Sequence, residues 1–348
     1  MIPGASLGDH RGSCGQRVFV VLLVAVLVFA QTRPAFAYLK FGVRAGGRQL
    51  TLKWAQPMVR YFVSDRVIAG GVAAGQFQAA IARAFATWEA VPTAAIAYQF
   101  GGFTSASPGE EDGLSTLGFQ NRPEFDRVLA ATSFVVDNTT GALIEGDIFF
   151  NSAFEWSTAE AGEPNRFDLE SIAVHEIGHF NGLGHSALGE TELREGGGRR
   201  VVALGSVMFP IAFGPGTTAG RLLHADDIAG ISDLYPDGDF QQTTGSLSGR
   251  VFKNGQPLFG AHIVAFDPAR GTMVGGFSLS AQGEFSIAGL FPGPYIVRVE
   301  PLDDADPDSF VDRSRTIDVD FRVTYSGRLV IVPREGDSGA VSIDVVPK

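Results

Sequence analysis

The chain has 348 residues, of which 45% are hydrophobic and 19% charged, and its formal net charge is -11. This length and composition indicate a globular protein that can bury a core and that has room for two domains. The acidic balance argues against a nucleic-acid backbone as partner, because proteins that bind one present basic surfaces.

The N-terminal residues predict a secretory signal peptide over residues 1–37. Arg11 and Arg17 precede an apolar run at 18–30, and Ala35-Phe36-Ala37 fits a small-x-small cleavage site. An uncleaved membrane anchor is the less favoured alternative, because this run of 13 residues is shorter than the roughly 20 that span a bilayer. We therefore expect an exported, secreted chain that starts at Tyr38 and has no stable membrane span.

Cysteine usage bears on redox chemistry. The only cysteine, Cys14, lies inside the predicted signal peptide. The mature chain is then expected to have no disulfide and no thiol that could cap a metal ion, so its stability must come from core packing and bound ions.

The first part of the mature chain mixes strand and helix patterns. Residues 72–90 predict a helix, because Phe77, Ile81, Phe85 and Trp88 recur at helical spacing and suit a buried face. Strands are expected over 39–63, 114–119, 127–136 and 144–151, with a loop at 101–113.

The most informative stretch runs from His175 to His185 and has the form H-E-x-x-H-x-x-G-x-x-H. On a helix, His175 and His179 lie one turn apart and can direct two imidazoles at one metal ion. Gly182 permits a turn that brings His185 in as third ligand. Glu176 lies about 100° around the helix from His175, where a general base for a zinc-bound water is expected. Three protein ligands leave the open position that a catalytic zinc requires.

The elements around this motif follow from local signals. Asp168 is a suitable N-cap for the motif helix. Residues 190–205 are polar and glycine-rich and predict a surface loop, whereas Asp226 and Asp227 open a short helix over 225–234. Residues 237–245 are expected to form a linker.

From Ser246 onward, helical patterns give way to short runs rich in Val, Ile and Phe between Gly and Pro turns. Strands are expected over 247–252, 261–266, 273–279, 283–287 and 295–299, which suggests an all-β sandwich. Further runs at 317–323, 329–332 and 340–346 belong either to this sandwich or to a small annex. His262 stands alone and is expected to be structural.

Residues 38–236 resemble the catalytic domain of the matrixins, the matrix-metalloproteinase branch of the metzincins. The likeness rests on the zinc motif, on Ser186 after the third histidine, on a Met-turn-like 207–210 around Met208, and on the Asp226-Asp227 pair in the closing segment. The resemblance implies an α+β fold, a twisted mixed β-sheet with about three α-helices. It also implies one catalytic zinc and a protein or peptide substrate.

The same resemblance implies the substrate-binding residues. Leu129 and Ala130 would lie in an edge strand that pairs with an extended substrate. Phe209, Pro210 and Ile211 would form a wall of the main specificity pocket.

Departures from the matrixin pattern concern other metals. Ala131 and Phe149 occupy positions where animal matrixins have histidines of a second, structural zinc. A second zinc built from histidines is therefore not expected. Calcium remains open through Asp137, Asp147 or residues 110–112, although these could equally be solvated turn residues.

Residues 245–300 are similar to the carboxypeptidase regulatory-like, transthyretin-type sandwich, through 249–251, 283–285 and 290–295. The resulting division is a signal peptide (1–37), a matrixin-like domain (38–236), a linker (237–245) and a β-sandwich (246–348), whose last forty or so residues are placed least firmly.

Two hypotheses from different classes follow. The first is an exported zinc endopeptidase with Glu176 as general base. The alternative is a catalytically silent binding or adhesion protein that uses the β-sandwich, and the intact Glu176 argues against it. The sequence leaves the oligomeric state open.

Overall fold

The computed structural model describes residues 39–66, 72–195, 197–311 and 315–348. The predicted signal peptide lies outside the described residues. Residues 35–348 group as one unit. Along the part of the chain that the structure describes, no helix is both long and apolar enough to cross a membrane.

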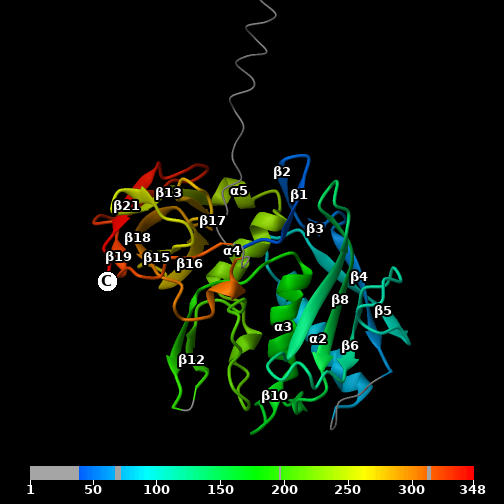
Figure 1. Ribbon diagram of the computed structural model, residues 1–348. Helices are drawn as coiled ribbons and strands as arrows, with labels where there is room; N and C mark the ends of the chain where they lie inside the picture. The colour runs from blue at the N-terminus through cyan, green and yellow to red at the C-terminus, as the bar shows by residue number, and fades with distance from the viewer. Residues whose placement is uncertain (1–38, 67–71, 196, 312–314) are drawn as a thin grey trace, which may run out of the picture. The chain divides into compact units, whose positions relative to one another are not determined.

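A mixed, mainly parallel β-sheet is the frame of the N-terminal half (Figure 1). Its strands are β3 (Lys53–Trp54), β4 (Met58–Ser64), β5 (Ala97–Thr104), β6 (Thr116–Gln120), β7 (Ala130–Val136) and β8 (Ala142–Asn151). The strand order is β3-β8-β6-β4-β5, and β7 runs antiparallel to β8. A separate hairpin, β1 (Gly42–Ala45) and β2 (Arg48–Thr51), precedes the sheet. The predicted mixed sheet is confirmed.

Two helices pack together against the sheet, α2 (Ala74–Glu89) and α3 (Leu169–Phe180). The predicted core face of α2 is confirmed: its Phe85 ring stacks on Tyr61 of β4 at 4.1 Å between centroids, and Trp88 is fully buried. Short parallel strands β9 (Trp156–Ser157) and β10 (Phe167–Asp168) lead into α3. The predicted N-cap is also present, because Asp168 Oδ2 accepts the Ser171 amide at 2.9 Å.

The segment after α3 corrects one prediction. Residues 190–205 were expected to be a loop, but β11 (Gly189–Leu193) and β12 (Arg199–Leu204) pair as an antiparallel hairpin. Local sequence does not reveal this because the hairpin is stabilised by a distant segment: the Thr191 amide donates to Asp304 Oδ1 at 2.8 Å. A 3-10 turn, η1 (Ala219–Arg221), and helix α4 (Ala225–Leu234) follow.

The C-terminal third consists of strands in two sheets. One sheet contains β13 (Gly245–Lys253), β14 (Gln256–Pro257), β17 (Glu284–Leu290) and β21 (Val341–Val345). The other contains β15 (His262–Asp267), β16 (Thr272–Phe277), β18 (Gly293–Glu300), β19 (Thr324–Tyr325) and β20 (Val330–Val332). Their apolar side chains contribute to a common buried cluster, and the likeness to a transthyretin-type module stays a prediction.

The predicted linker has some local structure, and one expected strand in this region was wrong. The predicted linker contains helix α5 (Phe240–Thr243), because Phe240 is buried and anchors one helical turn. The strand expected over 317–323 is reduced to an isolated bridge between Phe321 and Pro347. Phe321 is fully buried, so its apolar character reflects core packing without strand pairing.

The C-terminal sheets are joined to the N-terminal half by buried contacts. The Gly275 amide of β16 donates to Asp226 Oδ1 of α4 at 2.8 Å. A second apolar cluster crosses the same junction and comprises Ala187, Val201, Phe209, Phe277, Leu302, Ala305 and Phe310. The two halves are therefore packed as one structure.

Candidate metal centre

Helix α3 and the turn after it bring the three predicted ligands together. The Nε2 atoms of His179 and His185 are 3.2 Å apart, and the potential ligand atoms of these two residues and His175 all lie within 4.8 Å of one another. The turn depends on Gly182, whose φ of +98° is a left-handed conformation that favours glycine. A Cβ at Gly182 would also lie 2.3 Å from the Leu52 carbonyl oxygen.

A backbone carbonyl fixes the orientation of each imidazole. His175 Nδ1 donates to Val207 O at 2.7 Å, and His179 Nδ1 donates to Leu183 O at 2.8 Å. His185 Nδ1 donates to Ser309 O at 2.7 Å. A carbonyl only accepts, so each Nδ1 carries the proton and each Nε2 is left with a lone pair.

The donor set fits zinc. Zinc–nitrogen bonds of about 2.0–2.1 Å in a tetrahedral site separate the ligand nitrogens by roughly 3.3 Å, close to the 3.2 Å between His179 and His185. Burial lowers the pKa of all three imidazoles, and burial together with the neighbouring His175 lowers the pKa of His185 to about 4. The neutral imidazole is the form that binds metal.

Glu176 lies on the same helix and is 5% exposed. The Thr132 hydroxyl of β7 donates to Glu176 Oε2 at 2.7 Å. Burial raises the pKa of the Glu176 carboxyl to about 7, and the bond from Thr132 opposes this shift. Glu176 thus has a fixed orientation beside the histidines.

The floor beneath the histidines is a tightly packed turn around Met208. A Cβ on Gly178 of α3 would stand 2.2 Å from Met208 Sδ, so glycine is required for this close approach. The Asp227 carboxylate of α4 holds the turn by accepting the Val207 amide at 3.0 Å and the Ser206 hydroxyl. Met208 therefore packs directly against α3, and its role as a Met-turn stays a prediction.

Comparison with known proteins identifies this region. The family model described as matrixin matches residues 53–193, which include the three histidines and Glu176. Residues 53–193 are a matrixin domain. The match and the similarity to metalloendoproteinases support a zinc metalloendopeptidase for this domain.

Three relatives illustrate the similarity. Metalloendoproteinase 1 of Glycine max is 31% identical over 169 residues, which are 46% of this chain and 45% of that protein. Matrix metalloproteinase-25 of Mus musculus is 33% identical over 122 residues, 32% of this chain and 17% of that protein. Metalloendoproteinase 5-MMP of Arabidopsis thaliana is 41% identical over 75 residues, 21% of this chain and 16% of that protein. The chain thus covers less than half the length of each of these relatives.

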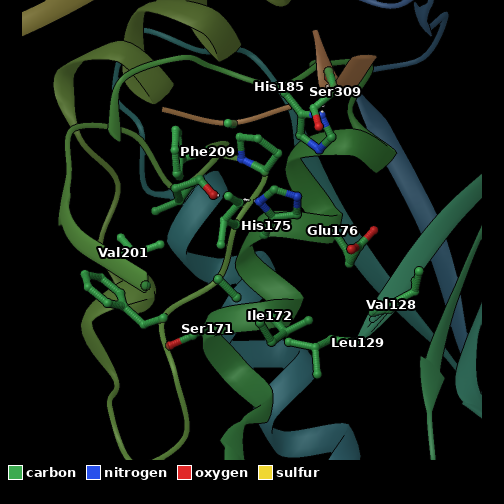
Figure 2. A pocket seen from close by; sticks show the side chains of 18 of the residues that line it. Val128, Leu129, Ser171, Ile172, His175, Glu176, His185, Val201, Phe209 and Ser309 are labelled. Carbon is green, nitrogen blue, oxygen red and sulfur yellow. Dashed lines mark hydrogen bonds between the residues drawn. The ribbon is translucent and has the colours of Figure 1, made fainter. Parts of the chain in front are cut away.

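A cavity of about 1380 Å³ opens over the predicted ligands of the matrixin domain. Leu129 and Ala130 line it, and so do Phe209, Pro210 and Ile211. In the view of Figure 2, Phe209 lies above His175 and Glu176 and Leu129 lies below them. The structure therefore brings all the residues predicted to bind metal or substrate to one cavity.

Segments beyond the family match also line this cavity. Residues 198–201 of the hairpin contribute to it, and so do Ala305, Asp306, Pro307, Ser309 and Phe310. Figure 2 shows Ser309 beside the His185 ring, whose Nδ1 donates to the Ser309 carbonyl at 2.7 Å. The matrixin domain alone therefore does not enclose the site.

Sequence reasoning missed the roles of three residues here. Asp227 appeared as a helix-start residue and as part of the matrixin-like closing segment, but its contacts with the Met208 turn were not predicted. Thr132 was placed in an expected edge strand, but its contact with Glu176 depends on how β7 packs against α3. Ser309 carries no sequence signal, because its contribution is a backbone carbonyl.

Positions considered for other metals have protein partners. Asp147 Oδ1 accepts the Thr116 amide at 2.7 Å and Oδ2 accepts the Gly109 amide at 2.6 Å. Asp137 accepts the Thr139 amide at 2.7 Å, as an Asx turn does. Ala131 lies opposite Phe149 in the β7–β8 pairing. These carboxylates stabilise loops, and calcium binding stays a prediction.

Proposed function

We propose that the chain is an exported zinc endopeptidase that hydrolyses peptide bonds at the matrixin site. The observation that carries this proposal is the convergence of three imidazole Nε2 atoms beside Glu176 at the base of one cavity. His175, His179 and His185 would hold the zinc, and the fourth position would face the cavity. Export rests on the predicted signal peptide.

The chain's own residues would handle the proton. A bound zinc ion would supply Lewis acidity, which makes a water molecule and the scissile carbonyl more reactive. The Glu176 carboxylate takes a proton from the water as the water oxygen attacks the carbonyl carbon. It passes this proton to the amide nitrogen as the carbon–nitrogen bond breaks. Thr132 keeps the carboxylate oriented through both transfers.

Strand β7 would position the substrate. Among the described strands, β7 pairs with β8 alone, and Ala130, Ala131 and Thr132 line the cavity. An extended peptide can add to such an edge through main-chain hydrogen bonds. This would hold the scissile bond over the histidines.

The opposite wall would select a side chain. Phe209, Pro210 and Ile211 present apolar surface to the cavity, which Ser171 and Gly220 also line. Because this wall is apolar, we expect a preference for an apolar side chain next to the scissile bond.

One experiment tests the proposal. Glu176→Ala should retain about one zinc per chain but cut a denatured protein substrate at least about 100-fold more slowly, because general-base catalysis contributes a factor of about 10²–10⁴. The control is Glu89→Ala, at the exposed end of α2, which should behave as the unmodified protein does. Full activity of Glu176→Ala would refute the mechanism, and absence of zinc from the unmodified protein would refute the proposal itself.

The alternative, a silent binding protein that uses the C-terminal sheets, makes a different prediction. In that case Glu176→Ala would leave every measurable activity unchanged. Truncation near Phe240 cannot separate the two functions, because it also removes the Ser309 carbonyl from His185. The Glu176 variant is therefore the discriminating experiment.

A further inference from the structure

His185 differs from the other two predicted ligands in what orients it. His175 and His179 lie on α3. Their Nδ1 groups donate to the carbonyls of Val207, in the turn around Met208, and of Leu183, in the turn after α3. His185 lies after the helix, and its acceptor is Ser309, 124 residues further along the chain. This acceptor belongs to residues 302–310, which follow β18 of the C-terminal sheets and are called the crossing segment below.

Apolar packing holds the crossing segment against the site. Phe310, next to Ser309, is 6% exposed and packs in the cluster with Val201 and Phe209. Its ring also lies 5.9 Å from that of Phe277 in β16. Burial of Phe310 thus anchors the neighbouring Ser309, whose carbonyl orients the His185 ring.

Hydrogen bonds join the crossing segment to the β11–β12 hairpin. The Thr191 amide donates to Asp304 Oδ1 at 2.8 Å, and the Thr191 hydroxyl donates to the Asp304 carbonyl at 2.7 Å. Asp306 then caps the short turn η2 (Pro307–Ser309) by accepting the Asp308 amide. These hydrogen bonds fix the position of the Ser309 carbonyl relative to the His185 ring.

We propose that the crossing segment is a positioning element of the metal centre, through which the C-terminal sheets set the affinity for zinc. The inference rests on the proposed zinc site. A hydrogen bond to the non-ligating nitrogen fixes the ring orientation and raises ligand basicity, and loss of such a partner costs about 10–100-fold in metal affinity. The C-terminal sheets then take part in building the site, in contrast to an accessory module attached beside it.

The test measures zinc affinity in the full-length chain. Phe310→Ala removes the apolar anchor of Ser309 and should weaken zinc binding about 10-fold or more. Phe310→Leu keeps an apolar anchor and should restore affinity to near that of the unmodified protein. Asp304→Ala removes a bond to the hairpin but no core side chain, and should weaken binding by about threefold or more. The matched control is Asp303→Ala, which loses only an exposed ion pair with Lys348.

Dissociation constants would be obtained by competition with a chromophoric chelator, with thermal unfolding of each metal-free variant as the check on folding. A cobalt-substituted form adds a spectroscopic readout, because the visible absorption of cobalt reports ligand geometry. Weaker zinc binding and an altered cobalt spectrum in Asp304→Ala, with Asp303→Ala unchanged, support the inference. Asp304→Ala also decides the matter if Phe310→Ala does not fold.

Zinc affinities within twofold of the unmodified protein in both Asp304→Ala and Phe310→Ala would overturn the inference. That result would leave the endopeptidase proposal intact, because the unmodified protein would still bind zinc and cleave protein. Failure of the unmodified protein to bind zinc is the separate outcome that refutes the proposed function and this inference with it.

Discussion

Gly178 lies where α3 rests on the turn around Met208. A Cβ at this position would stand 2.2 Å from Met208 Sδ and 2.9 Å from Trp88 Cζ2. Neither neighbour can easily move away. Met208 is 2% exposed, and the Trp88 ring is fixed by a 2.8 Å hydrogen bond from Nε1 to the Val174 carbonyl. The substitution Gly178→Ala therefore forces atoms apart inside a packed interior.

The sign of the effect depends on two opposing contributions. Alanine in place of glycine inside a helix stabilises the fold by about 1 kcal/mol. Overpacking a core costs about 1–3 kcal/mol, and two contacts below 3.0 Å place this site at the upper end. We expect a net loss of about 2 kcal/mol in the free energy of unfolding, which lowers Tm by roughly 3 °C for a unit of roughly 300 residues.

Urea unfolding followed by circular dichroism would measure the change. The matched control is Gly75→Ala in α2, where a Cβ meets nothing within 4 Å and the fold should be unchanged or stabilised by up to about 1 kcal/mol. Adding Met208→Ala to Gly178→Ala should cost less than the sum of the two single changes, because the clash is removed. A Gly178→Ala protein as stable as the unmodified one would refute the steric argument.

Two further predictions concern Thr132 and Glu300. Thr132→Val removes the hydroxyl that orients Glu176 and should lower kcat about 10-fold with little change in KM, because hydrogen bonds to charged groups contribute about 1.5–3 kcal/mol. Thr132→Ser keeps the hydroxyl and should restore kcat. An unaltered kcat in Thr132→Val would exclude this role for Thr132. Burial raises the pKa of Glu300, but hydrogen bonds and charges from His262 and Arg298 outweigh it and hold the pKa at about 2, below its ordinary 4.5. The interactions of ionised Glu300 with these two residues therefore contribute up to about 3 kcal/mol to the free energy of unfolding above pH 4.5. This contribution is lost as the pH falls toward 2. The urea midpoint of the unmodified protein should then fall more steeply with acid than that of Glu300→Gln, and parallel curves would contradict the assignment.

The parts of the site that sequence predicted are those encoded over a short range. The three histidines and Glu176 lie within eleven residues, and helical periodicity alone places His175 above His179. The Asp168 cap was predicted for the same reason, since a cap contacts the helix it begins. His262 was expected to be structural, and it is buried with its Nδ1 on Glu300 at 2.9 Å.

The parts that sequence did not predict depend on long-range contacts. The polar, glycine-rich sequence of residues 190–205 is typical of a loop, yet the segment forms a hairpin that is hydrogen-bonded to Asp304. Asp227 has the character of any acidic residue at a helix start, and only the fold brings the Met208 turn to it. A backbone carbonyl such as that of Ser309 can belong to any residue type, so no pattern in the sequence marks it.

The distance along the chain between His185 and Ser309 has a consequence for the order of synthesis. A ribosome releases His185 124 residues before the carbonyl that orients it. During that interval the His185 Nδ1 can be solvated only by water or by transient neighbours, and the crossing segment that lines the cavity has not yet been translated. The complete centre can thus be assembled only after the crossing segment has been translated, so synthesis of that segment sets the earliest moment at which the whole cavity can exist.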